Sequence, residues 1–350
     1  MFRPAALQPD PPLPLLVTGV AGVQGFHALK HFQAKYPGQV IGIRQADNWR
    51  LAGEGIVACN AEDAPALERL FEKHRFAAVL NCAGNCALRA CELDPRLAWR
   101  INVEGVGSLL SIVRTRGSRF VHMSVDLVFS GTAAGGHIES DPTDPVTVYG
   151  KTMAAAERLI LASYPPACIL RISLPMGFSP GGHAGAIDWI QSRFMKSKPA
   201  TLYFDELRTP TYADCLTDLF AAVLAGDLCG LYHAGGPRRL SLYQIAQIIN
   251  RVGGYDPDLV MGCPRIAAGP IPPRAGDVTM NSDKLRDALG YQPFNPWPRD
   301  DAWVPTHRKW HYDRHGGPGS RKRLAEILAN NPGRGVRYSI DGNAAEFVGQ

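Results

Sequence analysis

The segment Thr18-Gly19-Val20-Ala21-Gly22-Val23-Gln24-Gly25 decides the fold of this chain. It follows a short apolar run, residues 15–18, and precedes a stretch of helical composition, residues 23–36. Glycines permit a tight turn there and let backbone N–H groups approach a pyrophosphate, while the helix N-terminus adds a favourable dipole. A purely structural turn is the alternative. Because residues 18–25 lie between a strand and a helix, we predict that they form a dinucleotide phosphate loop.

Strand-like and helical segments alternate beyond this loop. Apolar runs near 40–43, 77–80, 119–123 and 167–172 alternate with helical patterns at 64–74, 95–116 and 148–163. This order predicts an α/β fold in which residues 14–173 form a Rossmann-type, doubly wound parallel sheet that binds NAD(P).

The pattern changes after Ser173, where Pro and Gly become frequent. Helical stretches near 186–196, 214–224 and 241–252 alternate with short strands near 201–204 and 231–233. We expect residues 174–298 to form mainly a smaller, substrate-binding C-terminal lobe, with some segments returning to the Rossmann core. Residues 299–350 are basic and interrupted by Gly and Pro, which indicates a solvated extension or a partner-binding segment.

Bulk composition excludes several classes of function. The net charge is only +5 over 350 residues, which is too small to indicate nucleic-acid binding. Apolar runs of membrane-spanning length are absent, and the N-terminal residues do not resemble a signal peptide. The eight cysteines lack the paired spacing of secreted proteins, so we expect reduced thiols and a cytoplasmic location.

Residues at the ends of the next strands complete a cofactor site. Arg44, at the end of the second strand, suits a ribose 2′-phosphate better than a 2′-hydroxyl, so NADP(H) is preferred over NAD(H). A solvated strand end is the alternative for Arg44. Asn60 and Ala61 follow the third strand and are placed to meet the adenine, and the small residues Cys82, Ala83 and Gly84 after the fourth strand would approach a cofactor ribose.

The segment Val148-Tyr149-Gly150-Lys151-Thr152-Met153 carries the main departure from a known catalytic pattern. A Tyr with a Lys four residues later on one helix face is the acid/base pair of many nicotinamide-dependent enzymes, because the ammonium lowers the pKa of the phenol. Here the Tyr is present and the fourth position is Met153. Lys151 is two residues from Tyr149, so we expect it to point away.

Many ordered motifs resemble the extended short-chain dehydrogenase/reductases, and most closely their dTDP-4-dehydrorhamnose reductase branch. The resemblance covers residues 14–295. Its marks are the glycine loop, Asn81-Cys82-Ala83-Gly84, Cys91-Glu92-x-Asp94-Pro95, Asn102-Val103-x-Gly105, the run from His122 to Gly131, Tyr149-Gly150-Lys151-Thr152, Leu170-Arg171-Ile172-Ser173, Arg208-Thr209-Pro210-Thr211, Tyr232-His233-x-Gly235-Gly236, Arg274 through Asp277 and Asn281-Ser282-Asp283-Lys284-Leu285.

The resemblance implies hydride transfer at the keto group of a nucleotide-linked sugar, with a catalytic Ser/Thr, Tyr and Lys and an Asn that organises a water relay. Tyr149 and Asn102 match the family Tyr and Asn, whereas Val125 and Met153 occupy the Ser/Thr and Lys positions. Neither Val nor Met can donate a hydrogen bond. Ser124 and Asp126 flank Val125 and are the candidates to replace the lost group, although alternation along a strand would direct them to the opposite face.

Candidate substrate residues are Asn85 and Cys86, in the loop after the fourth strand, and Arg208 and Arg274, whose guanidinium groups suit a diphosphate. Ion pairing is the alternative for both arginines. His183, in a Gly-rich loop, is a weaker candidate acid. We expect no metal site: cysteines 82, 86 and 91 lack zinc-binding spacing, and the histidines at 307, 311 and 315 precede a Gly-Gly-Pro stop.

Three functions remain open from the sequence. The first is an NADP-dependent reductase of a nucleotide-activated keto-sugar with an atypical active site. The second is a catalytically degenerate regulatory protein that binds NADP(H) and a sugar nucleotide, for which a regulatory subunit of methionine adenosyltransferase in the same branch is a precedent. The third is a non-redox isomerase or lyase. Dimers are common in the family, so a homodimer is one expected assembly.

Overall fold

A seven-stranded parallel sheet forms the centre of the computed structural model, which describes residues 10–313 and 319–332. The strand order is β11-β6-β5-β4-β1-β2-β3, and every pairing is parallel. The strands are β1 (Leu15–Val17), β2 (Val40–Arg44), β3 (Ile56–Ala58), β4 (Ala78–Asn81), β5 (Arg119–Val125), β6 (Cys168–Ile172) and β11 (Gly230–Ala234). The order reverses between β1 and β4, so the predicted doubly wound Rossmann-type fold is confirmed.

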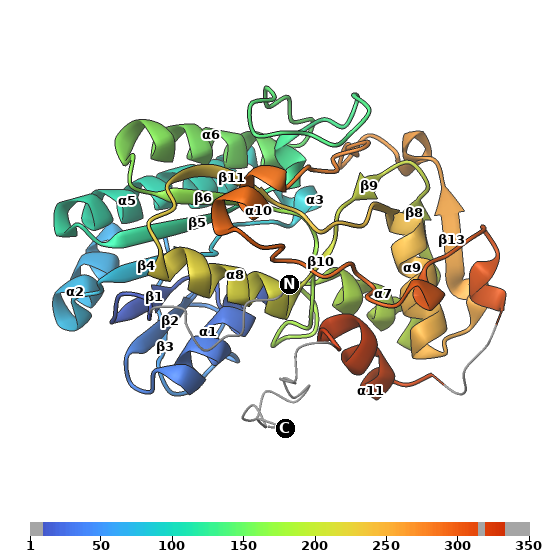
Figure 1. Cartoon of the computed structure of the whole chain (residues 1–350), viewed down its shortest axis with the longest axis horizontal. Coiled ribbons are helices and arrows are strands. Elements are labelled where there is room, and N and C mark those ends of the chain that lie inside the picture. The colour runs from blue at the N-terminus through green and yellow to red at the C-terminus, as the bar shows by residue number, and fades with distance from the viewer. Residues whose placement is uncertain (1–9, 314–318, 333–350) are drawn as a thin grey trace.

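Helices cover both faces of this sheet (Figure 1). One face carries α2 (Ala64–His74), α5 (Gly105–Arg116) and α6 (Val148–Ser163), and the other carries α1 (Val23–Lys35) and α8 (Ala213–Ala225). Each group buries its own apolar cluster, with Phe71 and Leu109 on the first face and Leu29 and Phe220 on the second. Because both faces are covered, the central strands are mostly buried along their whole length and do not alternate between buried and exposed residues.

The helix predicted over residues 95–116 is not continuous. It comprises α4 (Pro95–Trp99), a π-helical turn (Arg100–Glu104) and α5. Asn102 lies in the π-helical turn and is almost fully buried. A π-helical turn accommodates an extra residue, and such turns occur frequently at functional sites.

The second half of the chain supplies the lobe and two elements of the core. Strand β11 and helix α8 return to the Rossmann sheet, whereas β8 pairs with β13 and both pack against α9. The other elements are α3 (Leu88–Leu93), β7 (Pro175–Met176), α7 (Ala186–Met195), β8 (Ala200–Tyr203), β9 (Leu207–Arg208), β10 (Thr211–Tyr212), β12 (Leu240–Ser241), α9 (Leu242–Gly253), β13 (Val260–Cys263) and α10 (Asp283–Leu289). None of the helices within residues 10–313 and 319–332 is long and apolar enough to cross a membrane.

The C-terminal extension departs from the sequence prediction. Instead of a solvated tail, its described part contains α11 (Arg321–Leu324), which continues as a π-helical turn (Ala325–Ala329). Leu324 and Leu328 are fully buried in the main core, while Arg321 is exposed. The apolar face is short, with one Leu per turn, so it leaves little periodic signal in the sequence.

Candidate functional site

The phosphate loop and the loop after β4 lie in close contact at the carboxyl edge of the sheet. Gly19 has φ +67°, and a Cβ there would lie 2.3 Å from the carbonyl oxygen of Cys82. A Cβ on Gly25 would lie 2.3 Å from the carbonyl oxygen of Gly19. Thr18 joins the loops because its Oγ1 accepts a hydrogen bond from the Ala83 N–H at 3.0 Å. The glycines therefore allow α1 to begin directly at the loop, as a pyrophosphate site requires.

The ends of β2 and β3 meet this loop at the same edge. The Val20 N–H donates to the Ile43 carbonyl at 3.4 Å, and the Ala46 N–H donates to Oδ1 of Asn60 at 2.8 Å. Arg44 donates from Nη1 to the carbonyls of the next two residues, at 2.9 and 3.2 Å. The Arg44 guanidinium therefore stabilises the turn after β2, a contact that the sequence does not predict.

The predicted cofactor residues form a continuous arrangement along this edge. Gly22 caps α1, and a Cβ there would meet only the Gly19 carbonyl oxygen, at 3.5 Å, so the turn offers open space in front of the helix. The site brings together residues from four strand ends, namely Gly19, Val20, Ala21, Gly22, Val23, Gln24 and Gly25 after β1, Arg44 on β2, Asn60 and Ala61 after β3, and Cys82, Ala83 and Gly84 after β4. In α/β folds of this kind, dinucleotides bind at such strand ends.

Asn102 holds the loop after β4 against helix α6. Its Oδ1 accepts the Asn85 N–H at 2.6 Å, and its Nδ2 donates to the Asn85 carbonyl at 3.2 Å and to Oγ1 of Thr152 at 2.9 Å. The Asn102 side chain thus joins the predicted substrate loop to the helix that carries Tyr149. These bonds occupy the side-chain amide, so its evident role here is to position the loop.

Tyr149 lies in an apolar environment. It belongs to a buried cluster that includes Val125, Met153 and Cys91, and only 7% of Tyr149 is exposed. Lys151 is exposed, as predicted. Among the described residues, the Tyr149 hydroxyl has no hydrogen-bond partner. Burial raises the pKa of Tyr149 well above its ordinary value, and the charge of Asp126 adds to this. The phenol is therefore protonated at neutral pH. The shift in its pKa is opposite in direction to the shift that the Lys causes in the usual Tyr–Lys arrangement.

Ser124 does not face the Tyr149 hydroxyl as a replacement donor would. Its Oγ donates to Oε1 of Glu157 at 2.5 Å, and all of Ser124 is buried. Glu157 also accepts two hydrogen bonds from Arg171, at 2.9 and 2.7 Å. Glu157 was not singled out in the sequence, although it follows Met153 by four residues on the same face of α6, and this spacing is the signal that could have identified it.

Asp126, Arg208, Glu206 and Arg274 form a chain of alternating charges beneath Tyr149. Arg208 donates from Nε and Nη2 to the two oxygens of Asp126, at 2.6 and 2.5 Å, and its Nη1 lies 3.5 Å from Glu206. Arg274 contacts Oε2 of Glu206 at 2.6 Å, and the Ser173 hydroxyl donates to Asp126 at 2.6 Å. Both arginines therefore form the ion pairs that were the alternative to diphosphate binding, and these pairs are largely buried and join the lobe to the Rossmann core.

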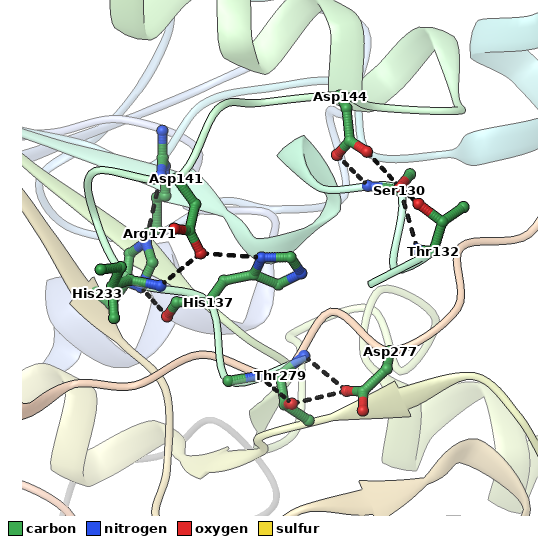
Figure 2. Close-up of polar contacts among 11 residues, drawn as sticks. Ser130, Thr132, His137, Asp141, Asp144, Arg171, His233, Asp277 and Thr279 are labelled. Atoms are coloured by element: carbon green, nitrogen blue, oxygen red, sulfur yellow. Dashed lines mark hydrogen bonds and ion pairs between the residues drawn. The ribbon is translucent and has the colours of Figure 1, made fainter. Parts of the chain in front are cut away.

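The loop between β5 and α6, residues 129–147, is held by polar contacts within itself, to β11 and to the segment around Thr279 (Figure 2). The Ser130 hydroxyl donates to Asp144 at 2.5 Å, and the Gly136 N–H donates to Oγ1 of Thr279 at 2.9 Å. Nδ1 of His233, on β11, lies 3.0 Å from the His137 carbonyl, and burial lowers the pKa of His233 to about 4. These contacts fix the entry of the chain into α6 and so the position of Tyr149.

The remaining polar candidates lie apart from Tyr149. His307 pairs with Asp313 at 3.2 Å, and Nδ1 of the buried His311 lies 3.0 Å from Nε2 of Gln247. His311 lies within a single 3₁₀ turn, Trp310–Tyr312, and His307 precedes this turn, while His315 is outside the described residues. Residues 10–313 and 319–332 contain no group of His, Cys, Asp and Glu arranged to hold a metal ion.

Comparisons with known proteins agree with this geometry. The family model of the RmlD substrate binding domain matches residues 13–300. The chain is 30% identical to a dTDP-4-dehydrorhamnose reductase of Streptomyces griseus over 67% of the chain and 78% of the relative. It is 25% identical to the methionine adenosyltransferase 2 subunit beta of Xenopus laevis over 66% of the chain and 69% of that protein.

Solved structures show the same fold. A dTDP-4-dehydrorhamnose reductase from Bacillus anthracis, solved in complex with NADP, superposes with a TM-score of 0.70. The match covers 81% of this chain and 95% of that one at 18% identity, so the likeness supports the architecture and no finer conclusion.

Proposed function

Because the chain belongs to the RmlD substrate binding domain family, we propose that it is an NADPH-dependent reductase of a nucleotide-activated keto-sugar. The observation that carries the proposal is the close contact of the glycine loop with the loop after β4, which Asn102 joins to the helix that carries Tyr149. Relatives named as dTDP-sugar reductases support the substrate class.

The chain offers distinct residues for each part of the cofactor. The N–H groups from Val20 to Val23 and the α1 N-terminus would hold the pyrophosphate, and Asn60 and Ala61 would meet the adenine. Arg44 supports NADP(H) over NAD(H) because it is the last residue of β2, where a 2′-phosphate would be placed. The reduced nicotinamide supplies the hydride. A homodimer stays a prediction.

Tyr149 carries a proton that it could donate to a substrate. Its hydroxyl is protonated at neutral pH and can donate to the oxygen of a carbonyl that is being reduced. Donation leaves a phenolate, which the apolar surroundings disfavour, so the raised pKa slows the proton transfer, and the phenolate must be reprotonated from solvent before the next turnover. The site therefore supports reduction at a rate lowered by the raised pKa and by the absence of a second donor at Val125.

The apolar surroundings of Tyr149 also favour a second candidate, a regulatory protein that binds the same ligands without turnover. Val125 and Met153 pack beside Tyr149 in one buried cluster, so two of the three family catalytic groups are replaced by apolar side chains. Similarity to a methionine adenosyltransferase regulatory subunit supports this reading. The non-redox alternative has no such observation in its favour.

Binding and turnover separate the two candidates. The protein is titrated with NADPH and NADH by fluorescence and then mixed with a panel of 4-keto dTDP- and UDP-sugars while NADPH oxidation is followed. Reduction by the wild type that falls at least about 100-fold in Tyr149→Phe, with NADPH affinity unchanged, supports the reductase. Tight NADPH binding with no oxidation supports the regulatory protein, and failure to bind either dinucleotide refutes both.

A further inference from the structure

We propose that the C-terminal segment, residues 319–332, is a positioning element for the phosphate loop. The segment lies beyond residues 13–300, which the family model matches, yet it is built into the core of the molecule. Two independent chains of contacts run from it to the first turns of α1. The inference rests on the proposed function in one respect, namely that the loop holds NADP(H).

The segment is anchored by apolar burial and by backbone hydrogen bonds. Leu324 and Leu328 are fully buried in the cluster that also contains Tyr212. The Leu328 carbonyl accepts the indole N–H of Trp297 at 2.8 Å, and the Ile327 carbonyl accepts the Tyr212 hydroxyl at 2.8 Å. Both donors are fully buried aromatic residues, so removing either carbonyl would leave a buried polar group without its partner.

The end of the segment contacts the start of α8. The Asn331 N–H donates to Oδ2 of Asp214 at 2.9 Å, and the Asn331 side-chain amide donates to Sγ of Cys215 at 3.2 Å. Asp214 is completely buried in the first turn of α8, two residues after Tyr212 at the end of β10. The segment therefore fixes the junction between β10 and α8 from both sides.

This junction in turn holds α1. The amide nitrogen of Gln24 donates to the Ala213 carbonyl at 3.1 Å and to Oγ1 of Thr217 at 3.2 Å, so both partners lie on α8. Gln24 is itself part of the phosphate loop sequence and only 2% exposed. One chain of contacts thus leads from Ile327 and Asn331 through the start of α8 to the first turn of α1.

A second chain of contacts reaches α1 through the loop after β7. The guanidinium of Arg321 lies 5.7 Å from the centre of the Phe178 ring. The Phe178 carbonyl lies 3.2 Å from Nε2 of His27, one turn further along α1 than Val23. Backbone N–H groups at a helix N-terminus bind an anion well only where their positions are fixed. We therefore expect that loosening the segment will loosen the loop, although no residue of the segment lies within it.

The test compares two leucines that are equally buried in the same core. Leu328→Ala loosens the C-terminal segment, and Leu285→Ala makes a similar cavity in α10, which packs against β11 away from α1. A second pair is Asn331→Pro, which removes the N–H that Asp214 accepts, and Asn331→Ala, which keeps it. The residue before position 331 already has φ −108° and ψ 136°, a conformation that a following proline tolerates.

Two readouts are taken at a temperature at which circular dichroism shows every variant folded. Hydrogen–deuterium exchange in peptides covering residues 18–30 is expected to accelerate at least fivefold in Leu328→Ala and Asn331→Pro, and less than twofold in the controls. The Kd for NADPH is expected to rise at least fivefold in the same two variants. Equal exchange of this loop in Leu328→Ala and Leu285→Ala would overturn the proposal. Since exchange needs no cofactor, a wild type that fails to bind NADPH refutes the proposed function and leaves this comparison intact.

Discussion

Restoring a lysine beside Tyr149 is the most direct test of the apolar site. In Met153→Lys the new ammonium would share the helix face of Tyr149, with the two Cβ atoms about 6 Å apart. With the ammonium about 6 Å from the phenolate oxygen and an effective dielectric constant of about 20, the cation favours the phenolate by about 3 kcal/mol, which is roughly a hundredfold in its ionisation constant. We therefore expect the pKa of Tyr149, now raised by burial, to fall in the variant.

The same substitution has a cost that the structure also predicts. Met153 is only 3% exposed, so the ammonium loses most of its hydration and the free energy of unfolding should fall by about 3 kcal/mol. Met153→Leu is the matched control, because it keeps an apolar side chain of similar volume. In a Val125→Thr background, Met153→Lys also restores both missing groups of the family site.

Ultraviolet titration of tyrosinate measures the expected change. The chain has 11 tyrosines, so each curve is compared with that of the same background carrying Tyr149→Phe, and the difference isolates Tyr149. The double variant should also reduce a keto-sugar that the wild type turns over at least about 100-fold more slowly. A difference titration that is identical in Met153→Lys and Met153→Leu, with both folded, would refute the electrostatic argument.

Three further predictions concern buried groups. Burial lowers the pKa of both His122 and His233 to about 4, below the usual value of 6.5, so the unfolded chain binds more protons than the folded one as the pH falls through this interval. Denaturant unfolding at pH 7, 6 and 5 should show stability falling by up to about 1.4 kcal/mol per pH unit for each imidazole, and a flat profile would contradict this. Asp126→Asn should destabilise the fold by about 3–5 kcal/mol because Arg208 keeps a buried charge, whereas Asp126→Leu combined with Arg208→Met should recover most of the loss in the melting temperature. Gly25→Ala places a methyl group 2.3 Å from a carbonyl oxygen, so NADPH titration should show at least tenfold weaker binding, and unchanged affinity would mean that the loop is not the dinucleotide site.

Local sequence was sufficient for the Rossmann half of this protein. The glycine loop lies between a strand and a helix within a few residues, and the helices at 64–74 and 148–163 have the predicted bounds. The placement of Tyr149 and Met153 side by side on one helix face also follows from their spacing of four residues. Each of these features depends on neighbours close along the chain, so residue type and periodicity determine them.

The tertiary structure alone decided how the polar groups pair. Asp126 and Arg208 are 82 residues apart, so no local pattern indicates that they form a buried ion pair. The break in the helix at Asn102 depends on bonds to residues on another loop and on α6. The C-terminal segment has too few turns for a periodic signal, and only its contacts with Tyr212 and Asp214 reveal it as part of the core. Burial and ion pairing are set by which distant segments the fold brings together, and a pattern along the chain does not contain that information.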